Sequence, residues 1–298
     1  MGIELNSYIL FWICIIGLCC GSFYNVVILR SLSGESIVLP PSKCPKCGQR
    51  LRPWHNIPVL SYIFLRGKCA FCKEKISIQY PLVEIAAMLL FAASYLCFGI
   101  DIKTLFVIIL GSGLLIMSVT DIKERVVDCN IALALALIGL IYNGFVTGNI
   151  TGSLLGVLAG VLIMECLARL GNFLFGIRAF GEADTYVAGT LGACFGLRGL
   201  VNTLGYSLVA AMIFIVPIFL YKQYKENNKL TCILSILFIL SVLAFKTLVQ
   251  NYITLALVIV FGIVLAITIL KGFKEQENKL YLPLVPAFVL GALYYIFF

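Results

Sequence analysis

Long apolar segments follow one another along almost the whole chain, separated by short polar connections and by one long polar stretch. An apolar segment of about 17 to 25 residues can cross a bilayer as a helix. The first such segment covers residues 8–29, and nine more follow the polar stretch at residues 31–80. The nine are residues 81–98, 103–120, 130–146, 151–175, 184–197, 199–220, 230–249, 252–270 and 280–298. The segment 184–197, which is the sixth span of the chain, is short. The pattern predicts an all-α polytopic membrane protein, a bundle of about 8–10 transmembrane helices.

The composition supports this prediction and excludes several classes of protein. Of the 298 residues, 61% are hydrophobic and 12% are charged, and the mean hydropathy is +1.05. Soluble domains carry roughly 25% charged residues, so a soluble enzyme, a disordered chain and a secreted disulfide scaffold are excluded. The first apolar segment is too long for a signal-peptide core and has Glu4 before it and Arg30 after it. It is predicted to remain as a first span with its N-terminus outside.

The basic residues predict how the chain is oriented. Nine Lys and Arg lie between positions 30 and 75, where only Glu35 and Glu74 oppose them. Basic connections mark the cytoplasmic side of a membrane protein, so residues 31–80 are predicted to be cytoplasmic. With alternating spans, the later basic connections fall on the same side, and Arg198 is the one clear exception. Because membrane topology explains the basic residues, no nucleic-acid partner is predicted.

Four of the twelve cysteines form two pairs in this polar stretch, and the other eight lie in or beside apolar spans. The pairs read Cys44-Pro-Lys-Cys47 and Cys69-Ala-Phe-Cys72. Two CxxC turns can place four thiolates around one ion, which predicts a tetrahedral zinc site. Another thiophilic metal and a redox pair are the alternatives. A closed four-thiolate shell leaves no open coordination position, so the zinc is predicted to hold the polar stretch together and not to catalyse.

Carboxylates are scarce, and two of them lie where an apolar span meets the cytoplasmic side. The chain has four aspartates, Asp101, Asp121, Asp128 and Asp184, and Asp121 and Asp184 occupy such boundaries. Two carboxylates that meet at a membrane face tend to hold one proton between them. The ionised member can then activate water while the protonated member binds a peptide carbonyl, which is aspartyl proteolysis. Ion pairing and solvation of the helix ends are the alternative explanations.

The single histidine narrows the chemistry further. His55 lies in the cysteine-bearing stretch, and the chain has no HExxH motif. An intramembrane zinc protease is therefore excluded, and a Ser-His protease is disfavoured. Glu165 and Glu182 are secondary candidates, and Glu165 is expected to pair with a polar neighbour. If the protein cuts peptides, carboxylates are the remaining catalysts.

Several of these motifs together resemble one family. Gly21-Ser-Phe-Tyr-Asn-Val-Val27 is similar to the GSFxNV signature of bacterial type IV prepilin peptidases. The likeness continues through the two cysteine pairs, Pro53-Trp-His-Asn-Ile-Pro58, Ser61, Arg66-Gly-Lys-Cys69 and Tyr80-Pro-Leu-Val-Glu84. It covers the chain from about residue 18 to residue 196.

The resemblance implies a multi-pass inner-membrane aspartyl protease. Such an enzyme removes the short basic leader of prepilins or prepilin-like pseudopilins on the cytoplasmic side. Many members also methylate the new N-terminal amine with S-adenosylmethionine as the methyl donor. The two catalytic aspartates of the family match Asp121 and Asp184, the latter in the GxGD motif.

The chain departs from the family pattern in three places. The GxGD motif reads Gly181-Glu-Ala-Asp184, and Ala183 would be strained at a position that needs positive φ. Asp128 replaces the usual Pro seven residues after Asp121, so either Asp121 or Asp128 is a candidate partner of Asp184. The C-terminal region is also long enough for one or two spans beyond the usual eight.

The resulting prediction divides the chain into a first transmembrane helix at residues 1–30, a zinc-binding cytoplasmic subdomain at residues 31–80 and a transmembrane aspartyl peptidase domain at residues 81–298. A non-enzymatic scaffold or transporter with a zinc loop is the alternative from another class, and a presenilin-like intramembrane aspartyl protease is the alternative within proteases. The predicted partners are a prepilin or pseudopilin and the lipid bilayer. The sequence leaves open the particular pilin, the presence of methylation and the oligomeric state.

Overall fold

The computed structural model describes residues 2–34, 36, 38, 41–175, 181–225 and 284–298, together with a few isolated positions between 233 and 264. The predicted spans 230–249 and 252–270 therefore lie outside the described residues, apart from those isolated positions. By contact, the chain divides into two compact units. The first comprises Met1–Glu165, Gly181–Ser207 and Pro283–Phe298, and it contains every candidate site residue. The second comprises Cys166–Phe180 and Leu208–Leu282.

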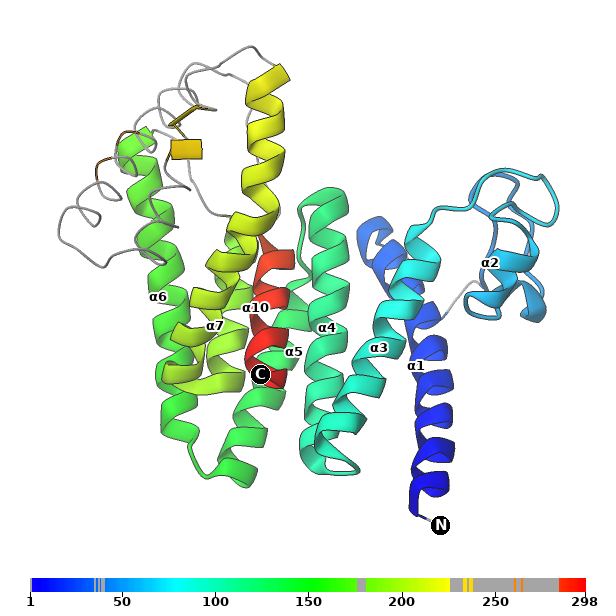
Figure 1. Ribbon diagram of the computed structural model, residues 1–298, viewed down its shortest axis with the longest axis horizontal. Coiled ribbons are helices and arrows are strands. Elements are labelled where there is room, and N and C mark those ends of the chain that lie inside the picture. The colour runs from blue at the N-terminus through cyan, green and yellow to red at the C-terminus, as the bar shows by residue number, and fades with distance from the viewer. Residues whose placement is uncertain are drawn as a thin grey trace. The chain divides into compact units, whose positions relative to one another are not determined.

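Most of the described residues are helical, and within them no strand longer than an isolated bridge is formed. The α-helices are α1 (Gly2–Ser33), α2 (Leu60–Phe64), α3 (Gln79–Phe98), α4 (Ile102–Glu124), α5 (Cys129–Tyr142), α6 (Ile150–Phe175), α7 (Glu182–Lys225) and α10 (Val285–Phe297). A 3-10 helix covers Pro53–Asn56, and a π-helix covers Asn143–Thr147. Figure 1 shows the helices in chain order.

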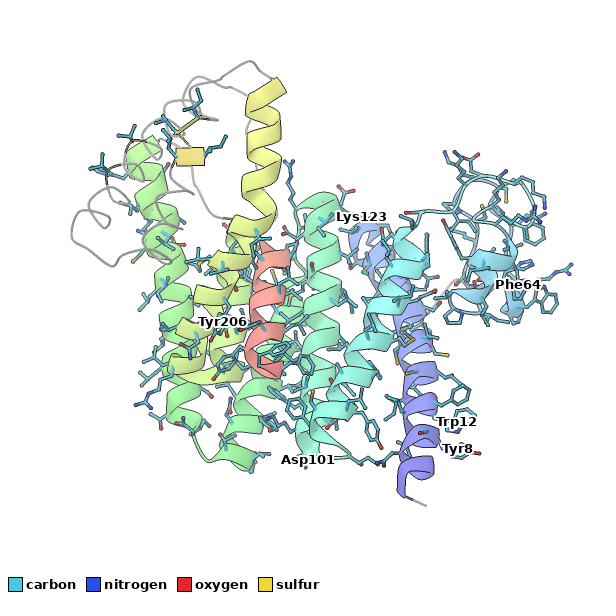
Figure 2. The ribbon with its side chains drawn as sticks, in the orientation of Figure 1. Tyr8, Trp12, Phe64, Asp101, Lys123 and Tyr206 are labelled. Carbon is cyan, nitrogen blue, oxygen red and sulfur yellow. The ribbon has the colours of Figure 1, made fainter. Side chains whose placement is uncertain are left out.

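Five of the described helices are long and apolar enough to cross a membrane. They are Asn6–Ser33, Gln79–Phe98, Ile102–Glu124, Cys129–Thr147 and Ile150–Leu170. Large apolar side chains also project outward from the helices. Tyr8 and Trp12 of α1 are exposed and point away from the neighbouring helices in Figure 2. These observations confirm the predicted all-helical, multi-pass membrane protein.

Helices α1 and α3 approach closely because glycines face the contact. A Cβ at Gly17 would lie 2.8 Å from the Met88 Cα, and one at Gly21 would lie 2.6 Å from the Glu84 Cα. As α1 advances from Gly17 to Gly21, its contact on α3 moves back from Met88 to Glu84, so the two helices are antiparallel. One turn beyond Gly21, the Asn25 amide donates to the Tyr80 carbonyl at 3.1 Å. The Gly21–Val27 motif is therefore a helix-packing motif in this structure.

Helices α6 and α7 also meet at glycines. A Cβ at Gly156 would collide with the Gly192 carbonyl, and a Cβ at Gly160 would lie 2.5 Å from the Ala188 carbonyl oxygen. The Asn143 amide donates to the carbonyls of Ala193 and Cys194, at 2.9 and 2.8 Å, so α7 is held from the α5 side as well. The first part of α7, which carries Asp184, is thus fixed between two neighbouring helices.

The chain reverses direction inside α7 at Gly196. Its φ of +69° is a left-handed conformation that glycine adopts without a Cβ penalty. Beyond this residue, α7 packs against α10, where a Cβ at Gly291 would collide with the Ser207 hydroxyl. The predicted spans 184–197 and 199–220 therefore correspond to the two segments that Gly196 separates.

Candidate active site

Asp121 lies in the last turns of α4 and is buried, with 6% of its surface exposed. Figure 2 marks the two ends of α4 with Asp101 and Lys123, and Asp121 belongs to the Lys123 end. Its Oδ2 accepts a hydrogen bond from the Val285 backbone N–H at 3.1 Å. The first residue of the last helix thus holds a carboxylate from the middle of the chain.

Asp184 lies in the first turn of α7 and is 8% exposed. Its Oδ2 accepts the Gly181 backbone N–H at 3.0 Å, which closes the turn that begins the helix. Ala183 is part of the helix and is not among the residues with positive φ. The alanine in the GxGD motif is therefore accommodated without the backbone strain that a positive φ would bring.

The structure brings Asp121 and Asp184 close enough to interact electrostatically. Two buried carboxylates that are close enough to interact repel each other when both are ionised. Asp128 has a different role, since its side chain accepts the Asn130 N–H at 2.9 Å and caps α5. Asp101 likewise caps α4 by accepting the Ile102 N–H at 2.7 Å. Of the aspartates, Asp121 is thus the electrostatic partner of Asp184.

The secondary carboxylates lie elsewhere. Glu182 is the first residue of α7 and is exposed, and Glu165 is half-buried on α6. Within the described part of the chain, neither glutamate hydrogen-bonds or interacts electrostatically with the Asp121 or Asp184 carboxylate.

The four predicted cysteines form one cluster. Their Sγ atoms all lie within 4.8 Å of one another, and the Sγ atoms of Cys44 and Cys72 are 3.9 Å apart. Four thiolates around a zinc ion at a bond length of about 2.3 Å would be about 3.8 Å apart in a regular tetrahedron. The donor set and its spacing therefore fit a four-thiolate zinc site.

Each cysteine pair sits on a tight turn of the same design. In the first turn, the Gly48 N–H donates to the Cys44 carbonyl at 2.9 Å, and in the second the Lys73 N–H donates to the Cys69 carbonyl at 3.2 Å. Gly48 and Lys73 both have positive φ, +70° and +61°. Backbone N–H groups of Cys72 and Phe71 lower the pKa of the Cys69 thiol to about 7. At Cys72 the Glu74 N–H is outweighed by burial and the neighbouring thiols, which raise the pKa of that thiol to about 11, so Cys69 is the first of the two to form the thiolate that binds metal.

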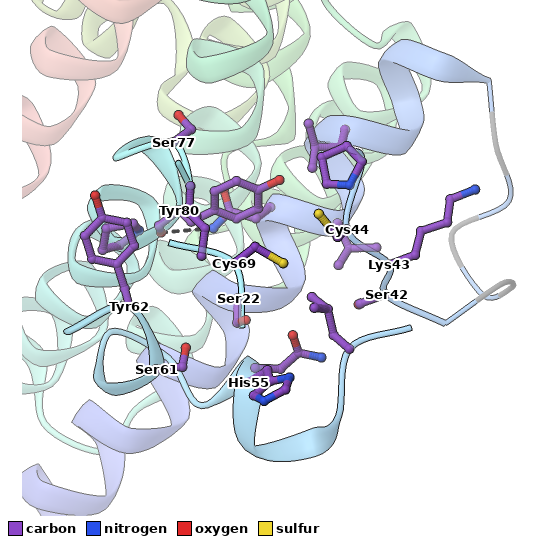
Figure 3. Close-up of a pocket in the computed structure, with 18 of the residues that line it drawn as sticks. Ser22, Ser42, Lys43, Cys44, His55, Ser61, Tyr62, Cys69, Ser77 and Tyr80 are labelled. Carbon is purple, nitrogen blue, oxygen red and sulfur yellow. Dashed lines mark hydrogen bonds between the residues drawn. The ribbon is translucent and has the colours of Figure 1, made fainter. Parts of the chain in front are cut away.

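A pocket of about 840 Å³ separates this cysteine cluster from the membrane helices. Figure 3 shows Cys44, Cys69 and His55 of the loop among the lining residues, together with Ser22 of α1 and Tyr80 of α3. It is of the size that small-molecule sites occupy.

Glu84 lies on the wall of this pocket and is 6% exposed. Its Oε2 accepts the Val59 N–H at 2.7 Å. Val59 has an unusual φ of +60° for a β-branched residue, at the start of α2. The buried carboxylate therefore ties a strained turn of the cysteine-bearing loop to α3.

Sequence reasoning missed two features of this site. The Val285 N–H is a backbone group, so no side-chain signal marks it. Glu84 belongs to the Tyr80–Glu84 motif, but its contact with Val59 requires the loop to fold back on α3.

The structure thus combines a multi-pass helical membrane protein, two buried aspartates and a four-cysteine loop. Comparison with known proteins identifies the family as one of membrane peptidases. The model of the bacterial peptidase A24 N-terminal domain matches residues 15–98, and that of the type IV leader peptidase family matches residues 108–216. The chain belongs to the type IV leader peptidase family and is an enzyme.

Three relatives illustrate the similarity, and each is named prepilin leader peptidase/N-methyltransferase. The protein from Burkholderia pseudomallei is 33% identical over 222 residues, which cover 66% of this chain and 72% of that protein. The protein from Myxococcus xanthus is 35% identical over 192 residues, covering 64% and 57%. The protein from Pseudomonas aeruginosa is 34% identical over 227 residues, covering 68% and 78%. No solved structure matches the chain significantly.

Proposed function

We propose that this protein removes the basic leader peptide of type IV prepilins or prepilin-like pseudopilins, at the cytoplasmic face of the inner membrane, with Asp121 and Asp184 as the catalytic pair. The observation that carries the proposal is that these two buried carboxylates lie close enough to interact electrostatically, in a chain of the leader peptidase family. The relatives' names, prepilin leader peptidase, support the same substrate class.

The hydrogen bonds of the two carboxylates suggest how they divide the chemistry. Each uses Oδ2 to accept a backbone N–H, from Val285 and from Gly181. Within the described residues the other oxygen of each carboxylate accepts no hydrogen bond and is available to water or substrate. The ionised aspartate takes a proton from water as the water oxygen attacks the scissile carbonyl carbon. The protonated aspartate hydrogen-bonds the carbonyl oxygen as negative charge develops on it.

Single replacements by Asn test this pair. Asn keeps the size of Asp but neither takes the proton from water nor holds the shared one. D121N and D184N are expected to lower leader removal by at least about a hundredfold in membranes that contain a reporter prepilin. D128N is the matched control, because an Asn side chain can still cap α5. Normal processing by either D121N or D184N would contradict the pair.

We further propose that the cysteine-bearing loop contributes the second activity in the relatives' names, N-methylation of the new N-terminus. The supporting observation is the pocket of about 840 Å³ between this loop, α1 and α3. S-adenosylmethionine is the donor expected for this transfer and supplies an electrophilic methyl group. In the pocket, Ser22, Tyr80 and Glu84 would bind and orient the ligand and exclude water.

The N-terminus of the mature pilin tests the second activity. Mass spectrometry of pilin processed in cells is expected to show the mass of one methyl group added to the N-terminal residue. An unmethylated amine from a pilin that has been fully cleaved would show that this protein is a peptidase only.

A further inference from the structure

The last helix, α10, begins at the candidate catalytic carboxylate. Val285 is its first residue and is fully buried, and its N–H donates to Asp121 Oδ2. The two residues are 164 positions apart in sequence. Residues 285–297 also lie outside the stretches that the family models match, 15–98 and 108–216.

Among the first four residues of α10, one N–H is left as a donor for this carboxylate. A helix has no internal partners for its first four N–H groups. Pro286 has no N–H, and the N–H groups of Ala287 and Phe288 donate to the Leu284 carbonyl at 2.9 and 3.1 Å. Leu284 provides no side-chain cap. The N–H of Val285 therefore depends on Asp121 for its acceptor.

The rest of α10 is fixed firmly enough to act as a support. At Gly291 the helix lies against the Ser207 side chain and the Thr203 carbonyl, with no room for a Cβ. Farther along, the ring of Tyr295 meets Phe195 edge-on at 5.1 Å, and Phe297 stacks on Phe98 at 6.0 Å. In Figure 1, α10 lies beside α4 and α7. The helix thus joins the elements that carry the two aspartates.

We propose that α10 is a positioning element for proteolysis and that the Val285 backbone N–H holds the Asp121 carboxylate in its working orientation. The inference rests on the proposed aspartate pair. The N–H fixes one carboxylate oxygen, so the other oxygen faces the water that attacks the peptide. The positive end of the helix also favours negative charge on the carboxylate it contacts. Val285 itself touches neither the water nor the substrate.

Val285→Pro removes the N–H at the first position of the helix, where proline itself is compatible with helical geometry. The preceding Leu284 is in the helical region (φ −94°, ψ −22°), so its backbone must adjust to the proline. The expected result is a kcat for a reporter prepilin lower by about tenfold or more, with KM unchanged, because substrate binding does not use this group. Val285→Ala keeps the N–H and removes only buried side-chain atoms, so its loss of kcat is expected to be smaller than that of Val285→Pro. Cys129→Pro shows the effect of a proline at the first position of another helix, α5, where the preceding Asp128 is extended and its side chain caps Asn130 and not Cys129.

A backbone variant removes the ambiguity of a proline that fails to fold. Incorporation of the α-hydroxy analogue of valine at position 285 replaces the N–H by an ester oxygen and keeps the side chain. The same loss of kcat is expected. A wild-type kcat in this variant would overturn the inference while the aspartate pair stands, and a higher kcat would show that α10 inhibits Asp121. Failure of the proposed function is a separate outcome, because the wild-type protein would then cut no prepilin.

Discussion

Ala183 and Asp128 depart from the family motif, and the local structure around each residue determines what the departure does. Ala183 replaces a motif glycine, yet it lies in a helical turn that any residue can adopt. Asp128 replaces a proline and caps α5 through the Asn130 N–H. Both residues are thus compatible with an arrangement in which the Asp121 and Asp184 carboxylates interact electrostatically.

Glu84 provides a prediction at this scale. Its carboxylate is buried and accepts the Val59 N–H. Glu84→Ala leaves that donor without a partner, and the expected loss in the free energy of unfolding is about 1–3 kcal/mol. Glu84→Gln keeps an acceptor oxygen at the same place and should remain close to the wild type. Thermal unfolding of the two purified variants in detergent compares them, and equal losses would contradict the assigned contact.

At the scale of helices, close approach of backbones sets the geometry of the site. Gly156 and Gly192 leave no space for a Cβ between α6 and α7, and Asp184 lies two turns before Gly192. Any widening of this contact moves the helix that carries the carboxylate. The glycines therefore act on the site through packing alone.

A pair of glycine variants in the same helix tests this packing. Gly192→Ala places a methyl group against the Gly156 carbonyl, and overpacking of this kind costs about 1–3 kcal/mol or more. Gly205→Ala is the matched control, because nothing lies within 4 Å of its added Cβ. Gly192→Ala should lower both thermal stability and leader cleavage, whereas Gly205→Ala should lower neither. A harmless Gly192→Ala would mean that α6 and α7 lie farther apart.

The two cysteine turns are a second structural element at this scale, and their zinc binding can be predicted. Substitution of Cys44 or Cys69 by Ser removes one of four thiolate donors and should reduce bound zinc in the purified protein well below one ion per chain. Each thiol must lose its proton to bind, so zinc should be retained at neutral pH and released as the pH falls. Elemental analysis of protein exchanged into buffers of decreasing pH measures both effects. Cys129→Ser, outside the cluster, serves as the control.

At the scale of the whole molecule, the alternating spans predict which connections face the cytoplasm. The connection between α4 and α5, residues 125–128, should be cytoplasmic, and the connection before α6, at Gly148, should be outside. Alkaline phosphatase fused at Gly148 is expected to be active, and the same enzyme fused after Arg125 inactive. Fluorescent-protein fusions at the two positions should give the reverse pattern. Activity at both positions would contradict the orientation and the cytoplasmic location of Asp121.

The sequence by itself determined the membrane class, the first five spans, the cysteine cluster and the two aspartates worth testing. These features depend on local information. A span is recognised from the hydropathy of consecutive residues, and a metal turn from the spacing of its ligands. The structure confirms the helical class and the cysteine cluster, while the catalytic roles of Asp121 and Asp184 stay a proposal.

Only the tertiary structure decided which carboxylates meet and which groups hold them. The sequence favours Asp121 as the partner of Asp184 but leaves Asp128 as an alternative, because Asp128 lies seven residues further on and carries the same charge. Their difference arises from the direction in which α4 ends and α5 begins, since the Asp128 side chain turns back to the Asn130 N–H. The bond from Val285 to Asp121 joins positions far apart in the chain through a backbone donor that every residue except proline possesses. Such a contact has no local pattern, so it becomes visible only when the helices are packed.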